Sequence, residues 1–305
     1  MRYVVAAGGE FLDIDAYGGI VAYAELLRLE GKAAVAVADR PLNASIPLGM
    51  RQLDLAIETN YQPQPDDSYV MIDISEPEFF APFVDQARVV EIIDHHPGFE
   101  AYWQGKGIVA QIEFIGAACT LVYERWHQSQ KQQDMSSSVA ALLAAGILDN
   151  TLNFTADVTT ERDHKAYVEL CRIGSLSSDF AADYFAQCQQ LIESDVERAI
   201  MNDRKSIQYP GYDGKLIVGQ LAVWDAAALL ASRERFIAIM AEQKIDVINV
   251  ISICDAKSYI VSRNAHAADW FSDLLSVQFV DGIAVTPRTW LRKEIMKLAI
   301  EKSGA

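Results

Sequence analysis

Two aspartates stand one residue apart near the start of the chain, in the stretch GGEFLDIDAYGG from Gly8 to Gly19. Asp13 and Asp15 follow a short apolar run and have glycines on both sides. One interpretation is a solvated turn with a helix cap, because aspartate and glycine are common in both. The other is half of a metal site. In extended backbone, residues i and i+2 project to the same side, and two close carboxylates repel each other without a cation between them.

A second unusual stretch is IIDHHPGF, which holds two of the five histidines of the chain, His95 and His96, directly after Asp94. A neutral imidazole is a ready metal ligand, and a neighbouring carboxylate can fix its tautomer. The alternative is a surface pair of histidines at a turn. Asp73 in SYVMIDIS and Asp149 in AALLAAGILD add carboxylates. Such oxygen and nitrogen ligands suit Mn²⁺, Mg²⁺ or Co²⁺, and two cations about 3.5–4 Å apart would suit in-line phosphoryl displacement by water.

These residues fall at the ends of predicted elements. Apolar runs predict strands at 3–7, 32–39, 68–75, 86–96 and 107–115, and helical spacing predicts helices at 16–31, 117–130 and 137–151. This alternation predicts an α/β fold with a mostly parallel sheet and helices on both faces. In such sheets ligands bind outside the carboxyl ends of the strands, which is where the candidate residues collect.

The second half of the chain has a different pattern. Helices are predicted at 161–174 and 183–205, followed by strands at 215–224, 246–255 and 258–264, helices at 228–244 and 269–278, and a basic tail at 288–305. We therefore expect two domains, a metal-binding catalytic domain at 1–190 and a smaller α/β substrate-binding domain at 191–305. The active site is expected in the cleft between them.

Composition narrows the class of protein. At 305 residues and 51% hydrophobic the chain can bury two cores, and its net charge of −16 argues against a protein that grips duplex nucleic acid. A small anionic substrate stays possible because a bound metal reverses the local field. No signal peptide and no membrane span is predicted. The four cysteines lack CxxC spacing and predict buried thiols of a reducing, cytoplasmic protein.

Taken together, four ordered motifs resemble the DHH phosphoesterase superfamily. They are DIDA at 13–16, the aspartate of VMIDIS, IIDHHP and AAGILDNT. Their spacing and the small basic C-terminal domain are similar to the branch of manganese-dependent (family II) inorganic pyrophosphatases and exopolyphosphatases, which combine a DHH domain with a DHHA2-like domain. GAACT at 116–120 and DVTTERD at 157–163 resemble segments that follow the third and fourth motifs. The resemblance covers essentially the whole chain.

The resemblance implies a role for each matching residue. The metal ligands would be Asp13, Asp15, Asp73, His95 and Asp149, with Asp73 bridging two Mn²⁺ ions, or Mg²⁺ or Co²⁺ in their place. Asp73 and His96 would be catalytic, with His96 contacting substrate phosphate or donating a proton, while Asp94 orients the histidines. Lys205, Arg292 and Lys293 would bind substrate phosphate, although the residues of a basic terminal helix are often simply solvated. A homodimer is a further implication.

One position departs from the pyrophosphatase pattern, which has a histidine where this chain has Gly9. Gly8-Gly9-Glu10 is more similar to exopolyphosphatase-like members, and Glu10 either substitutes as a ligand or lies exposed. We therefore expect a hydrolase that cleaves phosphoanhydrides, pyrophosphate or short polyphosphate, by two-metal activation of water. The alternatives are a phosphodiesterase acting on a nucleotide or short oligonucleotide, and a catalytically weakened phosphate-binding protein.

Overall fold

The computed structural model describes residues 1–303, which divide into two compact units. The first unit comprises Met1–Phe154 and Val158–Ala181, and the second comprises Thr155–Asp157 and the chain from Ala182 onward. Helix α7 (Phe180–Ser194) begins in the first unit and continues into the second. Among residues 1–303, no helix has the length and apolar character needed to cross a bilayer.

The first unit is built on a six-stranded sheet in which every strand pair is parallel. The strand order is β3-β2-β1-β4-β5-β6. The strands are β1 (Arg2–Ala6), β2 (Ala34–Val37), β3 (Ile57–Glu58), β4 (Asp67–Ile72), β5 (Val89–Asp94) and β6 (Val109–Ile112). The α/β class and the parallel sheet predicted from the sequence are confirmed.

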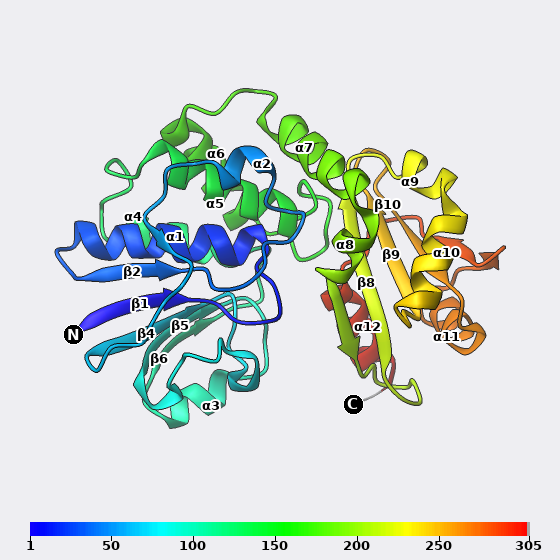
Figure 1. Ribbon diagram of the computed structural model, residues 1–305, viewed down its shortest axis with the longest axis horizontal. Helices are drawn as coiled ribbons and strands as arrows, with labels where there is room; N and C mark the ends of the chain where they lie inside the picture. The colour runs from blue at the N-terminus through cyan, green and yellow to red at the C-terminus, as the bar shows by residue number, and fades with distance from the viewer. Residues whose placement is uncertain (304–305) are drawn as a thin grey trace. The chain divides into compact units, whose positions relative to one another are not determined.

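Helices cover both faces of this sheet (Figure 1). They are α1 (Ile14–Leu29), α2 (Leu48–Arg51), η1 (Pro77–Phe79), η2 (Gln86–Arg88), α3 (Glu100–Gly105), α4 (Ala118–Gln128), α5 (Ser137–Asn150) and α6 (Glu161–Gly174). Helix α1 packs against β1, β2 and β4, α5 packs on α1, and α6 packs on α5. Helix α3 lies on the opposite face, against β6.

Alternation along β4 shows how the apolar pattern places these layers. Tyr69 and Met71 belong to a buried cluster with Trp103 of α3. Ile72, on the other face, faces α1 so closely that a Cβ on Gly19 would lie 2.6 Å from its Cγ2. Successive strand residues point to opposite faces, so a strand buried on both sides is apolar throughout.

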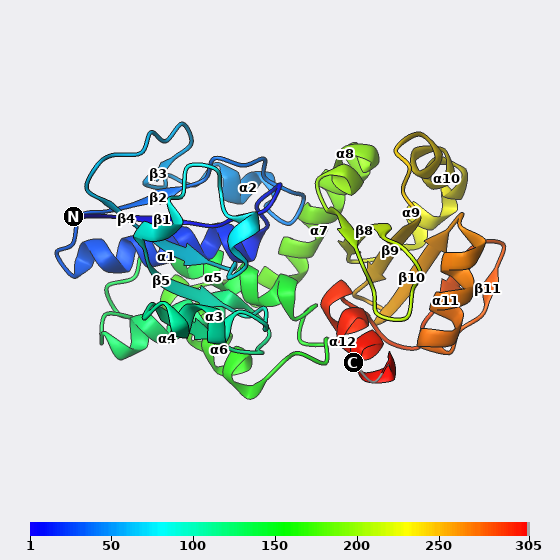
Figure 2. The same cartoon turned by 90° about the horizontal axis from the view of Figure 1, so that it is seen from below.

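The second unit holds a six-stranded sheet in the order β11-β12-β10-β9-β8-β7, in which only the β8–β9 pair is parallel among the described residues. Its strands are β7 (Arg204–Ile207), β8 (Leu216–Val223), β9 (Val247–Ser252), β10 (Lys257–Ser262), β11 (Phe279–Val280) and β12 (Ile283–Val285). Its helices after α7 are α8 (Val196–Met201), α9 (Ala227–Ala231), α10 (Arg233–Glu242), α11 (Ala265–Leu275) and α12 (Arg292–Ser303). Figure 2 shows α11 beside β10.

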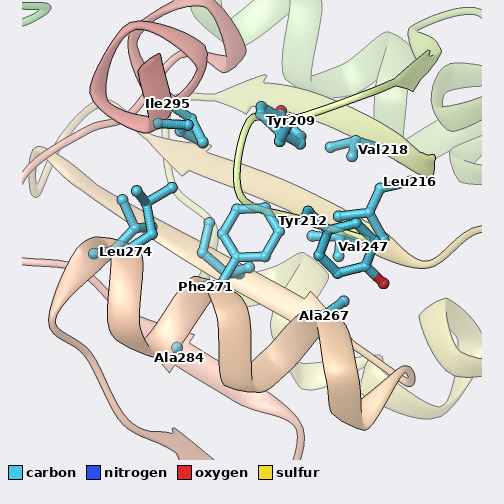
Figure 3. Packing of buried hydrophobic residues seen from close by; sticks show 13 residues of the cluster. Tyr209, Tyr212, Leu216, Val218, Val247, Ala267, Phe271, Leu274, Ala284 and Ile295 are labelled. Atoms are coloured by element: carbon cyan, nitrogen blue, oxygen red, sulfur yellow. The ribbon is translucent and has the colours of Figure 1, made fainter. Parts of the chain in front are cut away.

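The core of this unit lies between the sheet and helices α11 and α12. Phe271 of α11 and Ile295 of α12 pack with Val218 and Val247 of the central strands (Figure 3). Tyr209, in the loop after β7, is fully buried in the same cluster. The smaller α/β unit predicted from the sequence is therefore confirmed.

The predictions of two long helices in this half are wrong, because each is divided into shorter elements. The run 183–205 is interrupted at Asp195, whose side chain accepts a hydrogen bond from Arg198 N and caps α8, and its last residues form β7. The run 228–244 is interrupted at Ser232. Helical spacing continues across a cap because periodicity does not register where backbone hydrogen bonds are interrupted. Of the four free cysteines, Cys119 and Cys188 are buried as predicted, whereas Cys171 is half-buried and Cys254 is exposed.

Candidate functional site

Asp13 and Asp15 lie at the start of α1, and the expectation of extended backbone through both is wrong. Asp13 is the N-cap, and its carboxylate accepts a hydrogen bond from Ala16 N at 2.9 Å. Asp15 lies in the first helical turn and is fully buried. The helix cap and the inward-facing carboxylate are therefore both present, on different residues.

The N-terminus of another helix holds the Asp15 carboxylate. Its Oδ2 accepts from Ala118 N at 2.9 Å and its Oδ1 from Cys119 N at 2.7 Å, both in the first turn of α4. Free amides and the helix dipole make such a terminus a natural anion site. Burial, followed by the charge of Asp13, nevertheless raises the pKa of Asp15 to about 6. A bound cation would favour the ionised form of this carboxylate.

His95 follows β5 and is 2% exposed. Its Nδ1 lies 3.1 Å from the carbonyl oxygen of Ile115. Because a carbonyl only accepts, Nδ1 carries a proton, and in the neutral ring Nε2 presents its lone pair. Nε2 lies 3.2 Å from Oδ1 of Asp73 and 3.7 Å from Oδ2 of Asp15. A lone pair facing two carboxylates is repulsive unless a cation or a proton lies between them.

Asp73 is the first residue after β4 and has a positive φ of 59°. Its amide donates to the Ile93 carbonyl at 2.9 Å, which ties this strained residue to β5. A non-glycine residue in the left-handed region is uncommon and marks a position that the surroundings enforce. In this left-handed conformation, the Asp73 carboxylate lies beside both His95 and His96.

His96 completes a group in which Asp73, His95 and His96 each offer one ligand atom within 4.8 Å of the others. Nδ1 of His96 lies 2.9 Å from Oδ1 of Asp94, which also accepts from the amides of both histidines. Burial acts to raise the pKa of Asp94, but the imidazole of His96 and its hydrogen bonds outweigh that effect and lower it. The side chain of His96 is 44% exposed, so it can reach a bound molecule.

Asp149 is the penultimate residue of α5. Helix α5 passes the start of α1 three residues earlier, where a Cβ on Gly146 would lie 3.2 Å from the Cα of Asp15. Asp149 is not part of the compact Asp73-His95-His96 group. The structure thus brings Asp15, Asp73, His95 and His96 together, with Asp13 beside Asp15 and Asp149 on the neighbouring helix.

The stretch before Asp13 gives a structural reason for glycine at position 9, where the pyrophosphatase pattern has a histidine. Gly9 has a φ of +81°, and its amide donates to the Phe79 carbonyl at 2.7 Å. A side chain there would be strained by the backbone itself. A Cβ on the neighbouring Gly8 would lie 2.3 Å from the Phe79 oxygen. Gly8 and Gly9 therefore allow this turn to contact the segment after β4. Glu10 is exposed.

The three predicted substrate-binding cations lie in the second unit. Lys205, on β7, is exposed, and Lys293, in the first turn of α12, is half-buried. Arg292 is committed to its own unit. Its guanidinium donates to the side chain and carbonyl of Asp203 and, at 3.3 Å, to the Val218 carbonyl.

Sequence reasoning missed the groups that support these residues. Asp203, which pairs with Arg292, carries no local signal. The Ile115 carbonyl and the α4 amides are backbone groups that no residue type reveals. Asp163 had a signal, because Thr160 and Asp163 have capping-box spacing and both of its hydrogen bonds are present in the structure.

The donor set fits a divalent cation. Carboxylate oxygens and a neutral imidazole nitrogen converge, and the Ile115 carbonyl sets the tautomer of His95. These groups lie directly after β4 and β5 and in the first turn of α1. Asp15, Asp73 and His95 would hold the ion. The carboxyl ends of parallel strands thus converge as predicted.

Comparison with known proteins agrees with this geometry. Residues 4–147 match the DHH family, N-terminal domain, which confirms the family resemblance. A probable manganese-dependent inorganic pyrophosphatase of Bacillus licheniformis is 23% identical over 96% of each chain. A manganese-dependent inorganic pyrophosphatase of Methanothrix thermoacetophila is 25% identical over 81% of this chain and 79% of its own.

A solved structure from Methanococcus jannaschii, provisionally assigned as a family II inorganic pyrophosphatase, has the same fold. Its TM-score is 0.75 at 18% identity, over 99% of both chains. The likeness therefore covers both units of this chain.

Proposed function

Because the chain carries an N-terminal domain of the DHH family, we propose that it is a metal-dependent phosphohydrolase that cleaves phosphoanhydride bonds, with pyrophosphate or short polyphosphate as substrate. The relatives named as manganese-dependent inorganic pyrophosphatases support the substrate class and the metal. The observation that carries the proposal is the Nε2 of His95, which faces the carboxylates of Asp73 and Asp15 at 3.2 and 3.7 Å.

Each residue has a stated part in this proposal. Asp13, Asp15, Asp73, His95 and Asp149 would hold two Mn²⁺ ions. When bound, the ions would supply Lewis acidity and activate water near neutral pH. His96 is held by Asp94 and partly exposed, so it can contact a phosphate oxygen or move a proton to the leaving group. Lys205 and Lys293 are proposed to bind substrate phosphate, whereas Arg292 is paired with Asp203 within its own unit.

The experiment is phosphate release from pyrophosphate, tripolyphosphate, long polyphosphate and a dinucleotide, each with Mn²⁺ or Mg²⁺. We expect the wild-type protein to cleave pyrophosphate or tripolyphosphate faster than the dinucleotide, and His95→Gln to abolish the activity. His127→Gln is the matched control, because His127 is an exposed histidine of the same unit outside the site. Equal rates for the wild type and His95→Gln on every substrate would refute the proposal.

A further inference from the structure

A buried carboxylate outside the predicted ligand set links α6 to the candidate site. Asp163, in the first turn of α6, is fully buried. Its Oδ2 accepts from Thr160 N and Oγ1, each at 2.8 Å, and from Gly116 N at 3.2 Å. Its Oδ1 accepts from Thr120 Oγ1 at 2.6 Å. Two of these donors cap α6, and the other two belong to the segment 113–120, 43 and 47 residues away along the chain.

That same segment carries the groups that hold two candidate metal ligands. The Ile115 carbonyl accepts from Nδ1 of His95, and the amides of Ala118 and Cys119 donate to Asp15. The thiol of Cys119 donates to the backbone oxygen of Asp15 at 3.3 Å. The side chains of His95 and Asp15 are therefore oriented by one short stretch of backbone.

One peptide plane connects Asp163 to His95. The carbonyl of Ile115 and the amide of Gly116 belong to the same trans peptide, in which the two groups point in opposite directions. Asp163 fixes the amide side of this plane at 3.2 Å, and His95 contacts the carbonyl side at 3.1 Å. The negative charge of the Asp163 carboxylate, which accepts from the Gly116 amide, also polarises the peptide and makes the Ile115 carbonyl a better acceptor.

The close approach to Asp163 requires glycine at position 116. A Cβ there would lie 2.7 Å from both Cγ and Oδ2 of Asp163 and 2.6 Å from Cγ2 of Thr151. The carboxylate therefore occupies the space that a side chain would take, and it contacts the backbone directly. Thr120, in the first turn of α4, supplies the second contact.

We infer that Asp163 is a positioning residue of the metal site, which acts through the Ile115–Gly116 peptide to set the tautomer and orientation of His95. The inference rests on the proposed function, because it takes His95 to be a metal ligand. An outer hydrogen bond that orients a ligating histidine typically changes metal affinity by about 10–100-fold. Asp163→Asn places a side-chain NH₂ group, which donates, beside groups that also donate, and so weakens the hydrogen bond that holds the Gly116 amide.

The first test compares Mn²⁺ affinity, from the electron paramagnetic resonance signal of free Mn²⁺, in the wild type, Asp163→Asn and Asp67→Asn. Asp67 is a matched control, because it is a buried carboxylate of the same unit that accepts from Arg2, Tyr61 and Gln64 N at the opposite end of β4. We expect about tenfold weaker binding for Asp163→Asn only. Affinity within twofold of Asp67→Asn would overturn the inference.

The second test needs no metal. In ¹⁵N-histidine-labelled, metal-free protein, Asp163→Asn should shift the His95 ring nitrogens toward a mixture of tautomers, whereas Asp67→Asn should not. An unchanged His95 spectrum would overturn the positioning role. A wild-type chain that binds no Mn²⁺ would refute the proposed function, and the histidine spectrum would still decide the positioning role.

A milder pair covers the case in which Asp163→Asn does not fold. Thr120→Val removes only the hydroxyl that donates to Oδ1, and Thr120→Ser restores a hydroxyl. We expect Thr120→Val to shift the His95 spectrum and weaken Mn²⁺ binding, and Thr120→Ser to return both toward the wild type. If the two variants behave alike, the hydroxyl contact carries no positioning and the inference fails.

Discussion

Two candidate residues, Asp15 of the first unit and Arg292 of the second, lie in opposite electrostatic surroundings. In the first unit, backbone amides hold Asp15, and its carboxylate faces the Nε2 of His95, which also faces Asp73. In the second unit, the guanidinium of Arg292 forms an ion pair with Asp203, and its side chain is only 11% exposed. The first arrangement carries a negative charge that a cation or a proton would offset, whereas the Arg292–Asp203 pair is neutral by itself.

This difference separates two kinds of candidate residue that look alike in a sequence. A charged group held by neutral backbone keeps its charge available for a ligand. A charged group paired inside its own unit has much of that charge already neutralised. Matching a motif therefore identifies Asp15 and Arg292 equally well. Their surroundings indicate a ligand-binding role for Asp15 and a structural role for Arg292. The predictions below test this contrast, from the largest expected effect to the smallest.

The largest effect is expected at Asp73, because its carboxylate lies beside both His95 and His96. Asp73→Asn removes the charge that faces both histidines, so we expect phosphate release from pyrophosphate to fall by at least about 100-fold, more than for a residue behind the ligands. Asp66→Asn, a mostly exposed carboxylate of the same unit, should retain wild-type rates. Activity of Asp73→Asn near that of Asp66→Asn would contradict the metal-site assignment.

A pH effect on the metal-free protein should follow from Asp15. Its pKa of about 6 in the fold lies above the ordinary value of 3.8, so the folded state binds the proton more tightly. The stability contributed by protonated Asp15 is present below about pH 4, is lost as pH rises to about 6, and stays constant above that. The loss amounts to a few kcal/mol at about 1.4 kcal/mol per pKa unit.

The measurement is chemical unfolding of the wild type and Asp15→Asn with a chelator present, between pH 4 and 8. The stability difference between the two proteins should change between pH 4 and 6 and be flat above pH 6. A difference that is flat throughout would contradict the raised pKa of Asp15.

For Arg292, the contrast predicts a loss of stability. Arg292→Met leaves Asp203 and two carbonyls without their donor, so we expect the second unit to lose about 1–3 kcal/mol of unfolding free energy. Arg263→Met replaces an exposed arginine of the same unit and should stay within about 0.5 kcal/mol. If Arg292→Met is as stable as Arg263→Met but has a raised KM, Arg292 binds substrate rather than supporting the unit.

The smallest effect is expected at Lys205, an exposed cation on β7. Lys205→Ala should leave stability within about 0.5 kcal/mol. It should raise the KM for pyrophosphate about tenfold, which corresponds to about 1.4 kcal/mol of binding. Lys215→Ala removes another exposed lysine of this unit and should change neither quantity. Equal KM values for the two variants would exclude a phosphate contact at Lys205.

Local pattern was sufficient for most elements of the fold. The apolar runs predicted β1, β4 and β5 to within a few residues, and α6 was predicted at its observed bounds, Glu161–Gly174. Prediction failed where the backbone leaves the helix inside a periodic run, as at Asp195, whose side chain caps α8, and at Ser232, which lies between α9 and α10. A cap breaks the backbone ladder without altering apolar spacing, so periodicity alone misses it.

By itself, the sequence indicated which residues could bind a cation and that they follow predicted strands, because residue type and apolar alternation can be read locally. Only the tertiary structure decided their electrostatic state. Asp15 depends on amides 103 and 104 residues away, and His95 depends on a carbonyl 20 residues away. Backbone groups carry no residue-specific signal, and long-range pairing depends on the packed fold. The tautomer of His95 and the pairing of Arg292 therefore became visible only there.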